Sequence, residues 1–265
     1  MEIIKAMLLP ASIMFGIALV FGILLVILSQ VFSIEKDIKT EEIEKLLAGS
    51  NCGGCGKAGC SAFAGALIKG DANISECNST PKANKEKIAL LLGNGGNIGE
   101  DTVAVVHCNG GNFAKEKYEY QGYGDCKSAE IIAGGIKVCP TGCIGLNSCN
   151  KICPNYAIDV NMEGFAQVKK ELCTSCGACI INCPKSLISR IPRNAPIYIA
   201  CSNNCKGKDV REMCTHGCIA CGLCERVCPE KAITLVNNLP VVDYSKCKGC
   251  FLCVEKCPTK VIKKH

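Results

Sequence analysis

Tryptophan is absent from this chain of 265 residues, and aromatic residues make up only 5% of it. Large aromatic side chains therefore add little to a hydrophobic core. The chain also has no recognisable nicotinamide- or flavin-binding motif, so we expect it to bind neither NAD nor flavin. Bound metal clusters are the expected source of much of its stability, because they are held only by the folded chain.

Cysteine is abundant, with 25 residues. A disulfide framework is disfavoured, because the chain is long, the count is odd and no small-residue cleavage site follows the N-terminal apolar run. Zinc is a stronger alternative, since C-x2-C pairs often bind it. Repeated three-cysteine loops, however, supply more thiolates than a tetrahedral zinc site uses. This favours iron–sulfur clusters in a reducing compartment.

The spacing C-x2-C-x2-C-x3-C-P is typical of [4Fe–4S] ferredoxins, in which the fourth cysteine serves the other cluster of a pair. Complete copies begin at Cys173, Cys218 and Cys247. An incomplete copy begins at Cys143, with Leu146 at the position of its second cysteine. Cysteines of one half recur 74 or 75 residues later in the other. We therefore predict two duplicated ferredoxin-like modules, each with a hairpin between its cluster loops.

A different kind of site precedes these modules. It consists of Cys52, Cys55, Cys60 and Cys77, with glycines beside the first two cysteines. Glycine lets the backbone approach a cluster and donate N–H bonds to its sulfurs. We predict one closed [4Fe–4S] site within a small helical domain.

Because the fourth cysteine of each run is expected to serve the other cluster of its pair, the spacing predicts three complete ligand sets within the modules. They are Cys153, Cys173, Cys176 and Cys179; Cys218, Cys221, Cys224 and Cys257; and Cys228, Cys247, Cys250 and Cys253. A fourth set is provisional, with Cys139 as the substitute ligand beside Cys143, Cys149 and Cys183. A three-iron cluster, or no cluster, is the alternative there.

Five cysteines remain without a place in these sets: Cys108, Cys126, Cys201, Cys205 and Cys214. They are either buried thiols that pack as small apolar groups or ligands of one more cluster. The sequence thus indicates about five [4Fe–4S] clusters, with a sixth as an open alternative.

The segment from Ala6 to Ile34 contains no charged residue. It exceeds the ~20 residues needed to cross a bilayer and the usual length of a signal-peptide core. We therefore expect an uncleaved single-pass anchor in the cell membrane, with the cysteine-rich part on the cytoplasmic side. One span without an ionisable residue offers no ion path, so ion movement is expected in partner subunits.

The formal charge of +6 does not indicate nucleic-acid binding. Each oxidised [4Fe–4S] core with four thiolates carries a charge of roughly −2. Five clusters would therefore add roughly −10 and make the net charge slightly negative. Lysine patches are instead expected to steer an acidic ferredoxin.

An N-terminal apolar span, the sequence from Leu47 to Cys60 (L-x-G-x-N-C-G-x-C-G-x-A-G-C) and ferredoxin-type repeats occur in this order. This arrangement resembles the B subunit of the Rnf complex, in its extended clostridial and acetogenic form. The resemblance implies an electron-transfer subunit of a membrane complex that couples electron flow between reduced ferredoxin and NAD⁺ to Na⁺ or H⁺ translocation. It implies soluble ferredoxin and flavin- or NAD-binding membrane subunits as partners, besides the lipid bilayer.

The expected fold class is α+β, with an anchor over residues 1–35, a four-cysteine helical domain over 36–95, and ferredoxin-like modules over 96–195 and 196–265. The chain is expected to be part of an oxidoreductase and to have no catalytic residue of its own. Two other hypotheses stay open at this point. One is a membrane-tethered polyferredoxin that serves another reductase or a hydrogenase, and the other is a zinc-stapled interaction scaffold.

Overall fold

The computed structural model describes residues 2–31, 38–93 and 99–265. They form two compact units, Met1–Glu41 and Glu42–His265. The first unit contains a single long helix, α1 (Glu2–Val31), whose large apolar side chains between Met14 and Leu28 are exposed. The domain boundaries predicted after residues 35 and 95 both fall outside the described residues.

The predicted membrane span is contradicted by the structure. The predicted location at the cell membrane, which depended on that span, is wrong for the same reason. Across residues 2–31, 38–93 and 99–265, no helix combines the length and the apolar character needed to cross a membrane. The sequence argument rested on the whole uncharged segment from Ala6 to Ile34, and the last three residues of that segment lie outside the described part of the chain.

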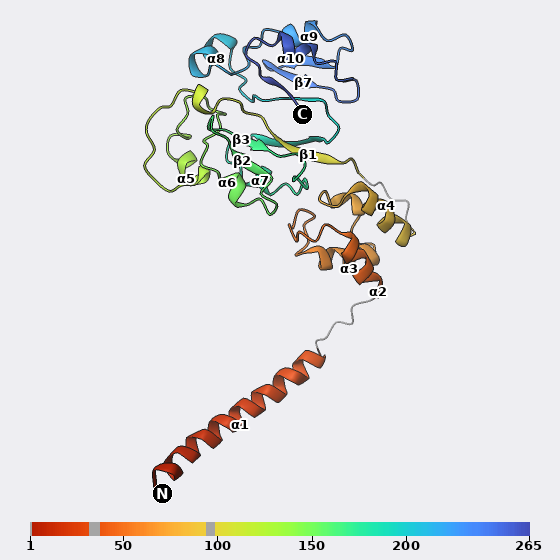
Figure 1. The fold of residues 1–265 in the computed structure, drawn as a ribbon, viewed down its shortest axis with the longest axis vertical. Helices are drawn as coiled ribbons and strands as arrows, with labels where there is room; N and C mark the ends of the chain where they lie inside the picture. The colour runs from red at the N-terminus through yellow and green to blue at the C-terminus, as the bar shows by residue number, and fades with distance from the viewer. Residues whose placement is uncertain (1, 32–37, 94–98) are drawn as a thin grey trace. The chain divides into compact units, whose positions relative to one another are not determined.

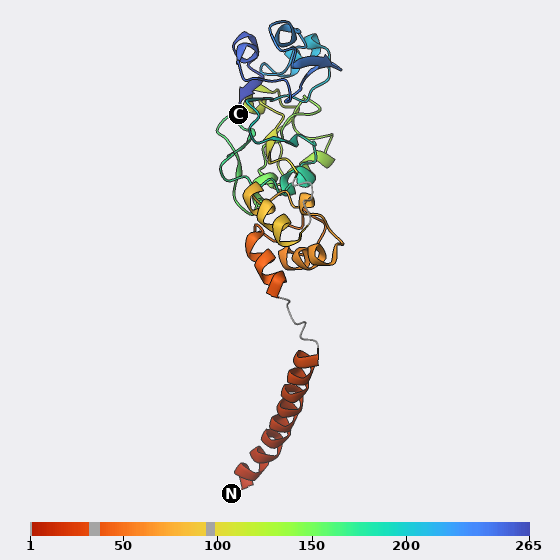
Figure 2. The same cartoon turned by 90° about the vertical axis from the view of Figure 1, so that its right-hand side faces the viewer.

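The segment that contains the first four-cysteine motif is helical (Figures 1 and 2). Its elements are α2 (Ile38–Leu46), α3 (Cys60–Lys69), the 3-10 helix η1 (Ile74–Glu76) and α4 (Lys82–Leu91). Ile43, Phe63 and Ile88 are at most 2% exposed and lie in one core. Helix α3 stops at Gly70, whose left-handed φ of 78° lets its N–H reach the last carbonyls of the helix.

The two modules have the same strand arrangement, which confirms both predicted hairpins. In the first, β1 (Thr102–Val106) pairs with β4 (Ile188–Pro192), and β2 (Ile158–Val160) pairs with β3 (Ala166–Val168). In the second, β5 (Ile197–Ile199) pairs with β8 (Ile262–Lys264), and β6 (Ile233–Val236) pairs with β7 (Leu239–Val242). All four pairs in the described residues are antiparallel, two-stranded sheets. The chain is thus a mixed helix-and-strand protein.

Short helices connect the cysteine loops to these sheets. They are η2 (Gly111–Phe113), α5 (Cys126–Ile131), α6 (Ser148–Lys151) and α7 (Ala178–Asn182) in the first module, and α8 (Gly207–Met213), α9 (Leu223–Arg226) and α10 (Leu252–Lys256) in the second. Four of them, α6, α7, α9 and α10, follow a residue with a positive φ: Asn147, Gly177, Gly222 and Phe251. This left-handed residue turns the chain from each cysteine loop into its helix.

Equivalent residues of the duplicated halves occupy equivalent core positions. Ile158 and Ile233 are each 1% exposed and begin the inner hairpins of their modules. Leu187 and Val261 are also 1% exposed, and each precedes the outer strand. The cores of both modules include cysteines, which pack against these aliphatic side chains. Each module is therefore stabilised by only a few apolar side chains together with its cysteines.

We expect Ile158→Ala and Ile233→Ala each to destabilise the chain by about 2–5 kcal/mol, because each leaves a cavity in a small core. Urea unfolding of the anaerobically purified, cluster-loaded chain measures this loss. Thr234→Ala changes an exposed residue of the same strand as Ile233 and serves as the control. Equal midpoints for Ile233→Ala and Thr234→Ala would contradict the assigned core.

Candidate iron–sulfur sites

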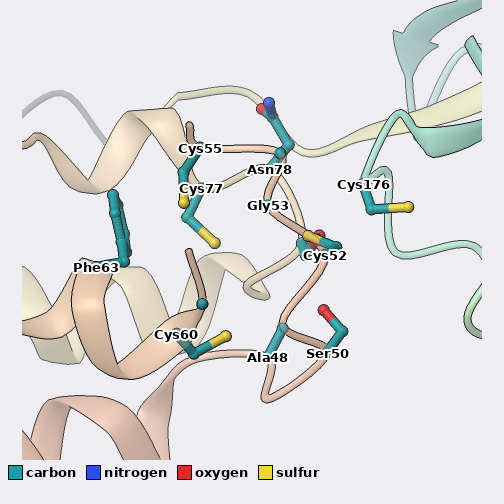
Figure 3. A pocket seen from close by; sticks show the side chains of 13 residues that line it. Ala48, Ser50, Cys52, Gly53, Cys55, Cys60, Phe63, Cys77, Asn78 and Cys176 are labelled. Carbon is teal, nitrogen blue, oxygen red and sulfur yellow. The ribbon is translucent and has the colours of Figure 1, made fainter. Parts of the chain in front are cut away.

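Four cysteines of the helical segment line one cavity of about 380 Å³ (Figure 3). They are the predicted ligands Cys52, Cys55, Cys60 and Cys77. The buried ring of Phe63 contributes to the wall. This donor set and this space fit a [4Fe–4S] cluster, which takes four thiolates.

Hydrogen bonds prepare this site to hold negative charge. Burial by itself would raise the pKa of the Cys52 thiol, but hydrogen bonds from Ser79 and from the Gly54 backbone outweigh it and lower the pKa. The Sγ of Cys77 lies 3.2 Å from the Oγ1 of Thr80. Asn51, at a left-handed φ of 44°, accepts the N–H of Cys60 on its Oδ1 at 2.8 Å and so ties the loop to α3.

The site adjoins the first ferredoxin-like module. Cys176 of that module also lines the cavity, and Figure 3 shows it on a separate loop beside Cys52. A methyl group added to Gly54 would stand 2.7 Å from the carbonyl oxygen of Cys176. Glycine at this position therefore permits the two cysteine loops to lie this close together.

The structure brings Cys153, Cys173, Cys176 and Cys179 together. Burial raises the pKa of the Cys179 thiol to about 12, and the three other thiols add to this rise. Backbone N–H groups point at two of the sulfurs: Ala157 donates to Cys153 at 3.2 Å and Ser175 to Cys173 at 3.4 Å. Such donors stabilise thiolates that ligate a cluster.

The provisional set around Leu146 is arranged differently from the prediction. Cys143, Cys149 and Cys183 line a cavity of about 390 Å³, and the fourth thiol there is Cys126, not Cys139. Burial raises the pKa of Cys143 and of Cys149 to about 12, and nearby thiols add to it. Leu146 packs with the apolar residues beside this site.

Helix α5 presents the thiol that sequence spacing missed. Asp125 caps this helix by accepting the N–H of Ser128 at 2.9 Å, and the N–H of Cys126 is held by Ser148 Oγ at 2.8 Å. Ser148 belongs to the incomplete cysteine loop itself, so the bond fixes Cys126 beside that loop. No spacing rule connects Cys126 to Cys143, although its position outside every motif marked it as unexplained.

The cysteines of the second module lie in two groups. Cys218, Cys221, Cys224 and Cys257 line a cavity of about 360 Å³. Burial raises the pKa of Cys253 to about 11, and Cys247 and Cys250 add to it. Cys228 packs in the same cluster of side chains. Among the ligand candidates, Cys221 and Cys250 are the exposed ones.

A further cavity of about 330 Å³ lies where residues of both modules meet. Its cysteines are Cys108, Cys139, Cys201 and Cys214. Three of the five thiols left over by the motifs therefore line this cavity together with Cys139. Cys205 lines none of the four cysteine-lined cavities.

Within the described part of the chain, no three His, Cys, Asp or Glu side chains are placed to hold a single metal ion.

Comparison with known proteins agrees with this geometry. A family described as a putative Fe–S cluster matches residues 47–79, an LdpA Fe–S cluster-binding domain matches 139–194, and a 4Fe–4S dicluster domain matches 217–261. The matched segments contain most of the grouped cysteines. The chain thus contains iron–sulfur cluster domains.

Relatives match over nearly the whole chain. The B subunit of the Na⁺-translocating ferredoxin:NAD⁺ oxidoreductase complex of Acetobacterium woodii is 39% identical, over 94% of this chain and 75% of that protein. The B subunit of the ion-translocating oxidoreductase complex of Methanosarcina acetivorans is 37% identical, over 90% and 91%. The chain belongs to the Rnf B family. A proton-translocating relative from Clostridium ljungdahlii, 37% identical over 88% of the chain, also belongs to this family. The resemblance seen in the sequence is confirmed.

In this Rnf B chain, we expect Gly54→Ala to destabilise the fold by about 1–3 kcal/mol, because the added methyl group overlaps the Cys176 carbonyl. Thermal unfolding of the anaerobically purified chain measures the effect. Gly65→Ala is the matched control: it lies in α3 with open space around it, and alanine there stabilises a helix by roughly 0.5–1 kcal/mol. Equal effects of the two substitutions would show that the loops do not meet.

Proposed function

We propose that this chain relays electrons within an ion-translocating ferredoxin:NAD⁺ oxidoreductase, from reduced ferredoxin toward the other subunits. The observation that carries the proposal is the series of four-cysteine groups, which adjoin one another from Cys52 to the C-terminal module. The activities named for the whole-length relatives support the reaction. NAD⁺ and flavin chemistry, and ion movement, belong to partner subunits.

We propose five [4Fe–4S] sites from the cysteine motifs, held by these sets: Cys52, Cys55, Cys60 and Cys77; Cys126, Cys143, Cys149 and Cys183; Cys153, Cys173, Cys176 and Cys179; Cys218, Cys221, Cys224 and Cys257; and Cys228, Cys247, Cys250 and Cys253. Each cluster supplies one-electron redox chemistry when bound. The chain provides cysteine thiols, backbone N–H donors to sulfur such as those of Ala157 and Ser175, and apolar side chains in the cavity walls. These features set the potential of each site.

Electrons enter at the C-terminal module in this proposal. Cys221 and Cys250 are exposed, so a cluster that they ligate lies near the surface. Exposed lysines, among them Lys231, Lys256 and Lys260, lie in the same module. Positive charge near a redox centre steers an acidic carrier such as ferredoxin and speeds its association, an effect that salt weakens.

Cys126→Ser is expected to remove one cluster, about four irons and four sulfides per chain, because it takes away the fourth thiolate of its site. Anaerobic iron and sulfide analysis measures this. Cys205→Ser is the control, since Cys205 lines none of the four-cysteine cavities. If Cys139→Ser, and not Cys126→Ser, removes the EPR signal of the cluster at Cys143, Cys149 and Cys183, the proposed ligand role of Cys126 is wrong.

The relay is tested in the assembled complex. We expect the triple charge reversal of Lys231, Lys256 and Lys260 to glutamate to slow NAD⁺ reduction by reduced ferredoxin and to flatten its dependence on salt. Reduction of the purified chain by dithionite, a small reductant, is expected to stay normal. A chain that copurifies with a hydrogenase and without flavin-binding subunits would overturn the proposed complex.

A further inference from the structure

The cavity at the junction of the modules gathers cysteines that are far apart in the chain. Cys108 follows β1 and Cys201 follows β5, whereas Cys139 lies in a loop and Cys214 ends α8. Cys108, Cys139 and Cys214 are buried, with 7–8% exposure. Four thiols from four separate segments thus line one cavity of about 330 Å³.

The two halves of the chain contribute to this space in the same way. Cys214 repeats Cys139 at a distance of 75 residues, the same offset that relates Cys143 to Cys218. Cys108 and Cys201 each stand two positions after the end of an outer strand. Each module therefore contributes an equivalent pair of thiols. Backbone hydrogen bonds join the two modules near these thiols. The N–H of Lys115 donates to the carbonyl of Met213 at 2.8 Å, and the N–H of Thr215 donates to the carbonyl of Phe113 at 3.1 Å.

Polar hydrogens are aimed at the sulfurs of this cavity. The side-chain amide of Asn203, a residue only 2% exposed, donates to Cys139 Sγ at 3.3 Å. The backbone N–H of Gly110 donates to Cys108 Sγ at 3.4 Å. A neutral thiol is a weak acceptor, whereas a thiolate is a strong one. Buried donors of this kind suit sulfurs that bear negative charge.

A glycine leaves room between two of these thiols. A methyl group at Gly110 would stand 3.3 Å from Cys214 Sγ, 3.3 Å from Ala114 Cβ and 3.6 Å from Cys108 Sγ. Inert packing explains neither the open cavity nor the donors.

We propose that Cys108, Cys139, Cys201 and Cys214 ligate one additional [4Fe–4S] cluster, which bridges the two ferredoxin-like modules. The proposal rests on the assignment of this chain as an electron relay. Cys139 is then a ligand of this additional cluster. Cys126, and not Cys139, is the fourth ligand beside Cys143, Cys149 and Cys183. Cys205 is then the cysteine without a cluster.

The four cysteines contact proposed ligand sets in both modules. The backbone N–H of Cys143 donates to Cys108 Sγ at 3.3 Å, and that of Cys218 donates to Cys201 Sγ at 3.4 Å. Cys143 is a proposed ligand of a site in the first module, and Cys218 is a proposed ligand of a site in the second. A cluster held here would accept one electron from a neighbouring cluster and so oxidise that cluster by one electron, without using a proton or a co-reactant. The duplicated modules thereby form one continuous relay.

Native mass spectrometry of the full chain, purified anaerobically, counts the clusters directly. We expect six in the unchanged chain and in Cys205→Ser, and five in each of Cys108→Ser, Cys139→Ser, Cys201→Ser and Cys214→Ser. Iron and sulfide should fall by about four each in those four variants. Five clusters in the unchanged chain, or loss of a cluster from Cys205→Ser alone, would overturn the bridge. The count in the unchanged chain does not depend on whether the cysteine variants fold.

A milder variant tests the same site by its potential. Asn203→Leu removes the amide donor to Cys139, so one EPR-monitored midpoint potential should become more negative while the others stay unchanged. No shift in any potential would contradict the bridge. Failure of ferredoxin to reduce the unchanged chain, with six clusters present, would instead count against the proposed function and leave the bridge intact.

Discussion

Ligation of iron–sulfur clusters by cysteine thiolates is the constraint around which the cysteine-rich part of this chain is built. The strands are three to five residues long and pair only in twos, and the aliphatic core of each module consists of a few side chains such as Leu187 and Val261. Two-stranded sheets of this size are marginal by themselves. Cysteines form part of the same cores, so metal–thiolate bonding and packing stabilise the fold together.

Duplication explains how one chain accommodates so many such sites. Each half has an outer strand pair and an inner hairpin, with cysteine loops between them. Because the halves are equivalent, residues at their junction occur in equivalent pairs, as Cys139 and Cys214 do. Two pairs that face each other supply four thiols, the number that a cluster requires. The junction of repeated modules is thus a natural place for a site that neither module contains alone.

The sequence predicted the two hairpins correctly because their signals are local. The three complete cysteine runs and the glycine-rich loop around Cys52 also lie within short stretches of chain, and the ligand sets drawn from them stay predictions. The loop with Leu146 was different, since the fourth thiol that lines its cavity is that of Cys126, 20 residues before Leu146. The membrane anchor was inferred from hydropathy alone, and the described residues contain no helix that meets the requirement.

The sequence by itself determined the cofactor class, the duplication and the family, because ligand spacing within a loop and overall similarity are written along the chain. Only the tertiary structure decided which distant thiols face one another. Cys126 reaches its partners through the Ser148 hydrogen bond, and Cys108 meets Cys201 where the modules join. Gly54 approaches Cys176 across a separation of more than a hundred residues. Such contacts depend on strand pairing and on loop geometry, which cysteine spacing does not encode.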